Sequence, residues 1–185
     1  MGRLAELMGV GPKPVAARTD TEMNSWGGMP YAQLSVILVN LRYLGMLHQT
    51  HHWISKGDPF YGDHKLYEQL YKTIVEEVDD VAEKAVGMGG EQNVCLGTQI
   101  EEMLRVSTMM GDKEDGVPTP EMLAKKSLLA EVAFIKCVTE MLQSMHDQGV
   151  RTDGISNMLQ GICDVHERHV YLLKRRSMAA TSGMR

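Results

Sequence analysis

The 185-residue chain has few aromatic residues, few cysteines and no long apolar run. Phe, Trp and Tyr make up 5% of it, whereas methionine occurs 15 times. The three cysteines, Cys95, Cys137 and Cys163, form no Cys-x-x-Cys motif, so we interpret them as free thiols in a reducing cytoplasm. No stretch approaches the 18 or so apolar residues of a membrane span, and the first residues do not resemble a signal peptide. We therefore expect a cytoplasmic protein with no membrane contact.

Positive charge is also scarce, since 19 Lys and Arg residues face 24 Asp and Glu residues for a net charge of −5. This balance argues against a protein whose whole surface binds nucleic acid, because such binding neutralises phosphates with Lys and Arg. The length suits one domain with an ample core.

The apolar residues recur at helical spacing, and Leu and Met in these segments favour helix over strand. Residues 1–30 are punctuated by Gly and Pro and are expected to form an irregular arm. The pattern predicts four long helices, near residues 31–55, 60–86, 120–148 and 153–176, and a short one over 94–109. The fold class is therefore all-α: a four-helix bundle over residues 31–176, with a short helix between the second and third long helices and a C-terminal tail over 177–185.

One set of side chains has the composition of an iron site. It combines two imidazoles with three carboxylates, which is a ligand set that suits iron. The set consists of His52, His64, Glu68, Asp79 and Glu83. The last four fall on the second predicted helix, where Glu68, Asp79 and Glu83 lie about 40°, 60° and 100° around the axis from His64. They therefore share one stripe of that helix.

A single helix cannot close this stripe around one metal ion. His64 and Glu83 are 19 residues apart, or roughly 28 Å along the helix axis. A second copy of the helix, antiparallel across a two-fold axis near Thr73 and Ile74, would bring Asp79 and Glu83 of one subunit opposite His64 and Glu68 of the other. We therefore expect two identical intersubunit metal sites, as a two-fold interface requires.

The same residues belong to a longer pattern. It comprises His52-Trp53-Ile54-Ser55-Lys56-Gly57-Asp58-Pro59-Phe60, followed by His64, Glu68, Tyr71, Asp79, Ala82 and Glu83. In these residues and their spacing the chain resembles the Dps family, ferritin-like mini-ferritins that oxidise and store iron and protect DNA. The family most often has Asp where this chain has Glu68, and a longer carboxylate still binds metal. The resemblance spans roughly residues 31–176.

The resemblance implies a function and an assembly. It implies a ferritin-like bundle that assembles into a hollow shell, most often a dodecamer. It also implies a ferroxidase that takes iron as Fe(II), oxidises it preferentially with hydrogen peroxide and deposits ferric oxide. Trp53 would lie beside the site, where it intercepts oxidising equivalents or packs at the two-fold interface. A cytoplasmic, nucleoid-associated location follows.

Other interpretations of these residues remain open. Taken singly, Glu68 is a candidate for an exposed ion pair with Lys65 or Lys72. The chain as a whole is also a candidate for a ferritin-like structural or DNA-associated assembly protein without iron turnover. The basic residues Lys174, Arg175, Arg176 and Arg185 suggest weak DNA binding through the C-terminal end. Alternatively, the first three only complement the negative end of the last helix.

The remaining histidines are left outside the predicted site. The chain contains no Glu-x-x-His motif, so a di-iron centre inside each bundle, as in ferritins proper, is not expected. His48 is expected to be a hydrogen-bonded core or interface histidine, with a role on the entry path or as an auxiliary ligand as the alternative. His51 is left out because it points about 100° away from His52. His166 and His169 are expected on a solvated helix face, with weak metal binding as the alternative.

Overall fold

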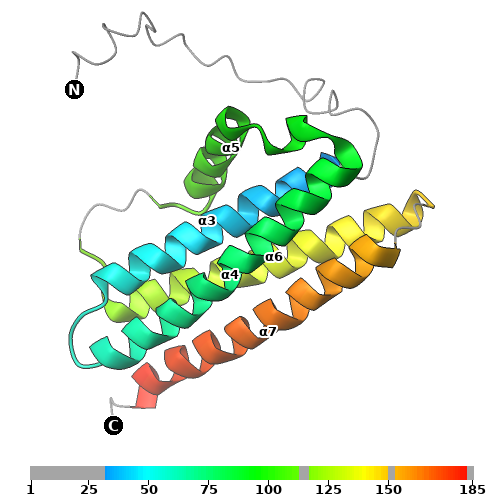
Figure 1. Ribbon diagram of the computed structural model, residues 1–185. Helices are drawn as coiled ribbons and strands as arrows, with labels where there is room; N and C mark the ends of the chain where they lie inside the picture. Colours follow the sequence, from blue (N-terminus) through cyan, green and yellow to red (C-terminus); the bar gives the residue numbers. More distant parts are fainter. Residues whose placement is uncertain (1–31, 113–116, 150–152, 183–185) are drawn as a thin grey trace, which may run out of the picture.

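The computed structural model describes residues 32–112, 117–149 and 153–182, which form helices and no strand (Figure 1). The helices are α3 (Ala32–Ile54), α4 (Phe60–Gly89), the short 3₁₀ helix η1 (Glu91–Val94), α5 (Leu96–Met109), α6 (Pro120–Asp147) and α7 (Asp153–Ser182). The all-α expectation is confirmed, with four long helices and a short one between the second and third. The N-terminal arm over residues 1–30 lies outside the described residues.

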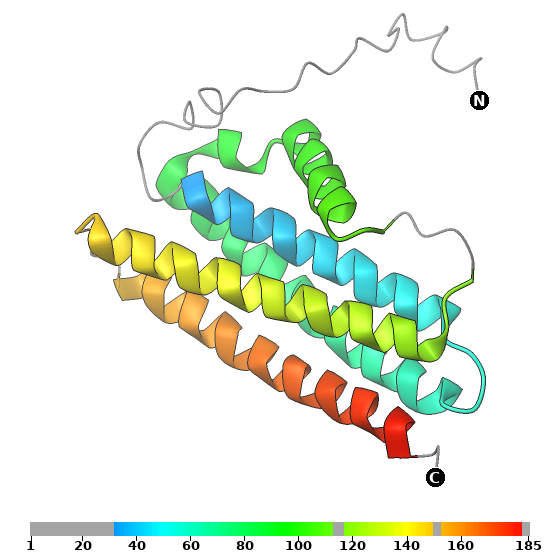
Figure 2. The same cartoon turned by 180° about the vertical axis from the view of Figure 1, so that it is seen from behind.

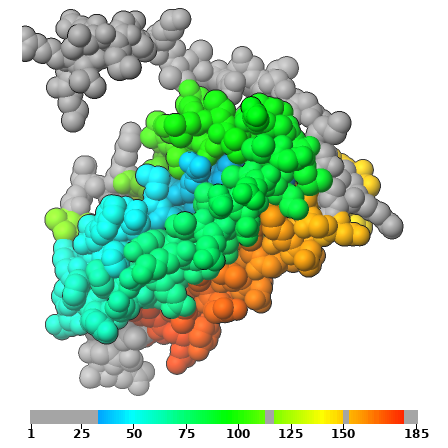
Figure 3. Space-filling view, in the orientation of Figure 1, coloured from blue at the N-terminus to red at the C-terminus, as the bar shows by residue number. Residues whose placement is uncertain are grey.

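The four long helices form two antiparallel hairpins that pack side by side. α3 pairs with α4 and α6 pairs with α7, while α5 lies outside the bundle against α3 (Figures 1 and 2). The segment through η1 and α5 returns the chain to the end of the bundle where α4 begins. α4 and α6 therefore run in the same direction, which is the single-crossover arrangement of ferritin-like bundles. The space-filling view shows α4 running across the outer surface of the molecule (Figure 3).

Local sequence signals set the helix ends. Gly57 adopts a φ of 74° in the turn between α3 and α4, a conformation that favours glycine, and its carbonyl accepts a hydrogen bond from the Phe60 amide. Thr119 caps α6, because its hydroxyl accepts a hydrogen bond from the Met122 amide at 3.2 Å, and Pro120 takes the first helical position. Both features match the sequence prediction.

Aliphatic stripes of the four helices meet in the core. α3 and α4 bury apolar side chains at helical spacing, and among these Leu34, Leu41, Leu70 and Ile74 are almost completely inaccessible. Phe134 of α6 adds an aromatic ring to this core and is 1% exposed. None of the helices in the described ranges is long and apolar enough to cross a membrane.

The C-terminal end of α7 departs from expectation. The helix continues to Ser182, beyond the end expected near Arg176, so part of the expected tail is helical. The Arg176 guanidinium donates to the buried Asp63 carboxylate, through Nη2 to Oδ2 at 2.9 Å and also through Nε. It also lies 3.7 Å from Glu121. Arg176 therefore ties α7 to the start of α4 instead of capping a helix end or lying free for DNA.

Candidate metal centres

The first candidate centre lies where α3 ends and α4 begins. The imidazole rings of His52 and His64 stack, with centroids 3.7 Å apart and an angle of 24° between their planes. The two residues are 12 apart in sequence, and the short turn at Gly57 brings them together. Tyr71 contacts the edge of His52, and Phe60 contacts His64.

Reciprocal hydrogen bonds fix the orientation of the two rings. His52 Nδ1 donates to the His64 carbonyl oxygen at 2.9 Å, and His64 Nδ1 donates to the His52 carbonyl oxygen at 3.1 Å. A neutral imidazole that carries its proton on Nδ1 has a lone pair on Nε2. A backbone carbonyl bonded to the other ring nitrogen is the usual partner of a metal-binding histidine. Both histidines therefore have one nitrogen ready for a metal.

The three carboxylates of the predicted site are separate from the histidine pair in one chain. Glu68 is held by Lys72 at 2.6 Å and Lys65 at 2.7 Å, which lower the pKa of its carboxyl. These lysines are exposed, so the pairs are weak and can yield to a metal. Asp79 and Glu83 lie exposed farther along α4. The exposed ion pair expected as the alternative for Glu68 is therefore present, with both lysines, and its metal binding stays a prediction.

Trp53 lies beside the histidine pair in sequence and is 68% exposed in the single chain. A large exposed aromatic side chain next to a candidate site is consistent with either role expected for it. It has surface available for a partner subunit, and its ring is accessible to oxidants.

A second group of ionisable side chains lies inside the bundle, and every long helix contributes to it. Its members are His48 and His51 of α3, Glu77 of α4, Ser127 and Glu131 of α6, and His166 and His169 of α7. None of these residues is more than 8% exposed. Burial of so many polar groups is tolerated only when they are paired with one another.

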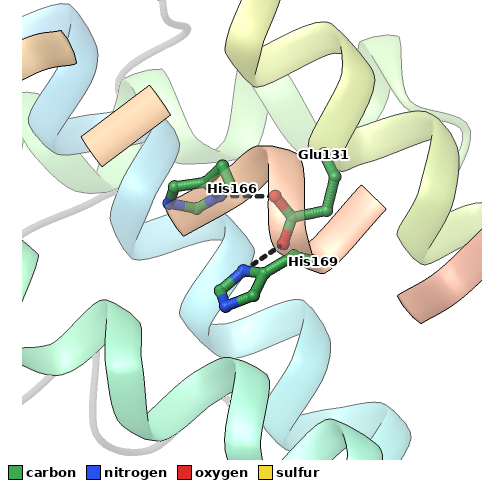
Figure 4. A group of neighbouring side chains, drawn as sticks. All are labelled: Glu131, His166 and His169. Carbon is green, nitrogen blue, oxygen red and sulfur yellow. Dashed lines mark hydrogen bonds and ion pairs between the residues drawn. The ribbon is translucent and has the colours of Figure 1, made fainter. Parts of the chain in front are cut away.

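Glu131 is the hub of this buried cluster (Figure 4). Its Oε1 accepts hydrogen bonds from His48 Nε2 at 2.7 Å and from His169 Nδ1 at 3.2 Å, and its Oε2 accepts one from His166 Nδ1. His166 Nε2 donates in turn to Glu77 Oε2 at 2.9 Å. A ligand atom of each of Glu131, His166 and His169 lies within 4.8 Å of the others.

The protonation states follow from burial and partners. Burial alone would lower the pKa of His166, but its bonds to Glu131 and Glu77 raise that pKa to about 9. Burial alone would raise the pKa of Glu131, but its bonds from His166, His169 and His48 lower it well below the usual carboxyl value. In the metal-free chain the centre of the bundle therefore contains an imidazolium between two carboxylates.

A hydroxyl extends the buried cluster toward a cavity. Ser127 Oγ lies 3.2 Å from His48 Nδ1 and 2.8 Å from His51 Nδ1. Burial lowers the pKa of His51 to about 3, so this imidazole is neutral at pH 7. His51 also lines a cavity of about 520 Å³ between α3, α5 and α6, whose other lining residues include Asp112.

The structure corrects the expectation for His166 and His169 and confirms the one for His48. His48 is the hydrogen-bonded interior residue that was expected. His166 and His169 are 0% and 2% exposed, so the solvated-face assignment was wrong, and His51 is buried within the cluster. A signal was present in the sequence: His166 and His169 continue the stripe of Ile155, Leu159 and Ile162 on α7, with spacings of four and three residues.

Comparison with known proteins supports the resemblance seen in the sequence. A nutrient stress-induced DNA-binding protein of Nostoc sp. is 26% identical over 121 residues, which cover 64% of this chain and 63% of that protein. The match thus spans less than two thirds of that relative. DNA protection during starvation protein 2 of Bacillus anthracis is 25% identical over 123 residues, covering 66% of this chain and 79% of that protein. No protein-family model matches the chain.

Solved structures of Dps proteins share the fold. DpsC from Streptomyces coelicolor is 22% identical with a TM-score of 0.67, over 90% of this chain and 91% of that one. An archaeal Dps homologue from Halobacterium salinarum is 16% identical with a TM-score of 0.68, over 92% of this chain and 93% of that one. The resemblance to the Dps proteins is thereby confirmed, and with it the ferritin-like fold.

We predict that Glu131→Ala destabilises the metal-free chain by about 3–5 kcal/mol, because it leaves three buried imidazoles without their shared acceptor. The pKa of Glu131 is depressed by folding, so its contribution is present above the usual carboxyl pKa and is lost as the pH falls below it. Denaturant unfolding between pH 7 and pH 3 measures both effects. Glu140→Ala, an exposed change on the same helix, is the control and should cost less than about 0.5 kcal/mol.

Proposed function

We propose that this chain, which resembles the Dps proteins in both sequence and fold, oxidises Fe(II) and stores the product as ferric oxide inside a hollow homo-oligomer. The observation that carries the proposal is the pair of stacked imidazoles, His52 and His64, each with Nδ1 bonded to a carbonyl oxygen. This arrangement orients both rings and leaves both Nε2 lone pairs for a metal. Iron is the substrate here.

In the proposed site, His52, His64 and Glu68 of one subunit bind Fe(II) together with Asp79 and Glu83 of the two-fold partner. Imidazoles and carboxylates bind Fe(II) and also tolerate Fe(III). Two Fe(II) ions give two electrons to hydrogen peroxide, which takes up two protons and becomes two water molecules. Consuming both reactants together prevents hydroxyl-radical formation and so protects DNA. Trp53 is positioned to intercept stray oxidising equivalents.

The alternative function is that of a DNA-associated assembly protein without significant iron turnover. The names of the two relatives, a DNA-binding protein and a DNA protection protein, favour some role with DNA. Anaerobic loading with Fe(II), followed by hydrogen peroxide, separates the two functions. Rapid growth of ferric absorbance supports the ferroxidase, and a rate equal to that of protein-free solution supports the alternative.

We predict that Asp79→Ala with Glu83→Ala lowers the initial rate of iron oxidation about tenfold or more, as does His52→Ala with His64→Ala. Each double variant removes one half of the same site. Asp80→Ala, an exposed neighbour on α4, should leave the rate unchanged.

Mixing the two double variants tests whether the site lies between subunits. Chains without the histidines still supply Asp79 and Glu83, and chains without these carboxylates still supply His52 and His64. Refolding an equal mixture should therefore restore part of the activity, because some mixed dimers contain an intact site. If activity returns in no mixture of correctly assembled chains, the intersubunit arrangement is wrong.

We also predict a closed homo-oligomer, most simply a dodecamer, because the proposed site needs at least two subunits and the Dps resemblance supplies the higher symmetry. Multi-angle light scattering measures the mass of the assembly against the 20.6 kDa chain. A stable monomer, with or without iron, would contradict the proposal.

Any DNA binding should be weak and should depend on the exposed cations at the C-terminal end. Lys174 and Arg175 are exposed, whereas Arg176 is engaged with Asp63, so the first two and Arg185 carry the prediction. Repetition of these cations over an oligomer strengthens phosphate binding. Gel-shift titrations across salt concentrations measure the affinity for DNA. This affinity should fall about tenfold or more when Lys174 and Arg175 are replaced by Ala and residues 177–185 are removed. Binding that survives these changes would place the DNA contact elsewhere.

A further inference from the structure

We propose that the buried cluster inside each four-helix bundle binds one divalent transition-metal ion, held by Glu131, His166 and His169, with His48 as a further ligand and Glu77 orienting the His166 ring. This site is separate from the proposed iron-oxidising site. It is made by one chain alone, and it does not depend on iron oxidation.

The donor geometry is close to that of a metal site. A ligand atom of each of Glu131, His166 and His169 lies within 4.8 Å of the others. Metal–nitrogen and metal–oxygen bonds of about 2.1 Å place two ligands at most about 4.2 Å apart. The three donors therefore need only a small inward movement to surround an ion. Figure 4 shows that the two imidazoles of α7 and the carboxylate of α6 already point toward one another.

The chemistry of the donors selects the class of metal. Imidazole nitrogens suit Zn²⁺, Fe²⁺, Ni²⁺ and Cu²⁺, whereas Mg²⁺ and Ca²⁺ prefer oxygen ligands. The two histidines of α7 are three residues apart, which places them on one helix face. Together with His48 of α3 they give the proposed site three imidazoles, which is the nitrogen-rich composition of a transition-metal centre.

Glu77 fixes the orientation of one proposed ligand. It is buried, and its Oε2 accepts the hydrogen bond from His166 Nε2 at 2.9 Å, whereas Glu131 lies at Nδ1 on the other side of the same ring. Nδ1 is therefore the nitrogen that faces the proposed ion. A carboxylate bonded to the other ring nitrogen is the usual partner of a metal-binding histidine.

The proposed route of the ion lies on the α5 side of the bundle. His51 lines the cavity of about 520 Å³ there, and its Nδ1 lies 2.8 Å from Ser127 Oγ, which in turn lies 3.2 Å from His48 Nδ1. His51 and Ser127 therefore lie between the cavity and the proposed ligands.

The test uses the assembled full-length chain carrying His52→Ala and His64→Ala, so that the proposed iron-oxidising site is disabled. After removal of metal with a chelator, the protein is dialysed against Zn²⁺, and bound zinc is measured by elemental analysis. We expect about one tightly held Zn²⁺ per chain. Adding Glu77→Gln, which keeps the size of the side chain, should weaken Zn²⁺ binding at least about tenfold. Adding His169→Gln should weaken it further.

The matched control is His146→Gln, which removes an exposed imidazole of α6 and should leave zinc binding unchanged. Circular dichroism and light scattering verify that each variant is folded and assembled. Binding of Co²⁺ gives a second readout, which needs no substitution in the cluster. An intense visible absorption band from the parent protein supports a low-coordinate site with protein ligands. A band as weak as that of aqueous Co²⁺ contradicts the proposed site. The proposal is overturned if the parent binds no Zn²⁺, or if folded Glu77→Gln and His169→Gln proteins bind it as tightly as the parent.

Discussion

The structure depends on the burial of one carboxylate, that of Glu131, at the centre of four helices. It is fully inaccessible and accepts hydrogen bonds from imidazoles of α3 and α7. A charge in such a place is stable only when all its partners are in position. The four helices must therefore reach one common register along the bundle axis before this carboxylate can be buried. Aliphatic stripes alone would allow small axial shifts, which the polar cluster forbids.

The fold gathers two groups of side chains of the types that bind metals, and the two groups differ in their surroundings. His52 and His64 lie partly exposed where α3 meets α4, with Nε2 lone pairs available and two of the proposed ligands, Asp79 and Glu83, expected from a partner subunit. The buried cluster lies within one chain and is closed to bulk water. An open site suits a substrate that must enter and leave, whereas an enclosed site suits an ion that stays. The two groups adjoin in the sequence, because His51 of the inner cluster directly precedes His52 of the outer pair.

The crossover connection through α5 determines which residues of α6 and α7 lie beside those of α3 and α4. Because it returns the chain to the end where α4 begins, α6 runs parallel to α4 and its residues Ser127 and Glu131 come level with His48 and His51 of α3. The same arrangement brings the end of α7 beside the start of α4, where Arg176 pairs with Asp63. α5 itself covers one side of α3 and forms a wall of the cavity that reaches His51.

The sequence by itself determined the helices, their order and the His52–His64 pair, because these follow from local periodicity, capping residues and a short turn. It could not assign the inner cluster, since His48, His51, Glu131, His166 and His169 come from three helices up to 121 residues apart. Histidine is common both on solvated faces and in cores, so its spacing alone did not show that α7 turns these two residues inward. Only the packing of α7 against α6 and α4 decided that. The expected intersubunit site remains a prediction, because its ligands lie on separate copies of the chain.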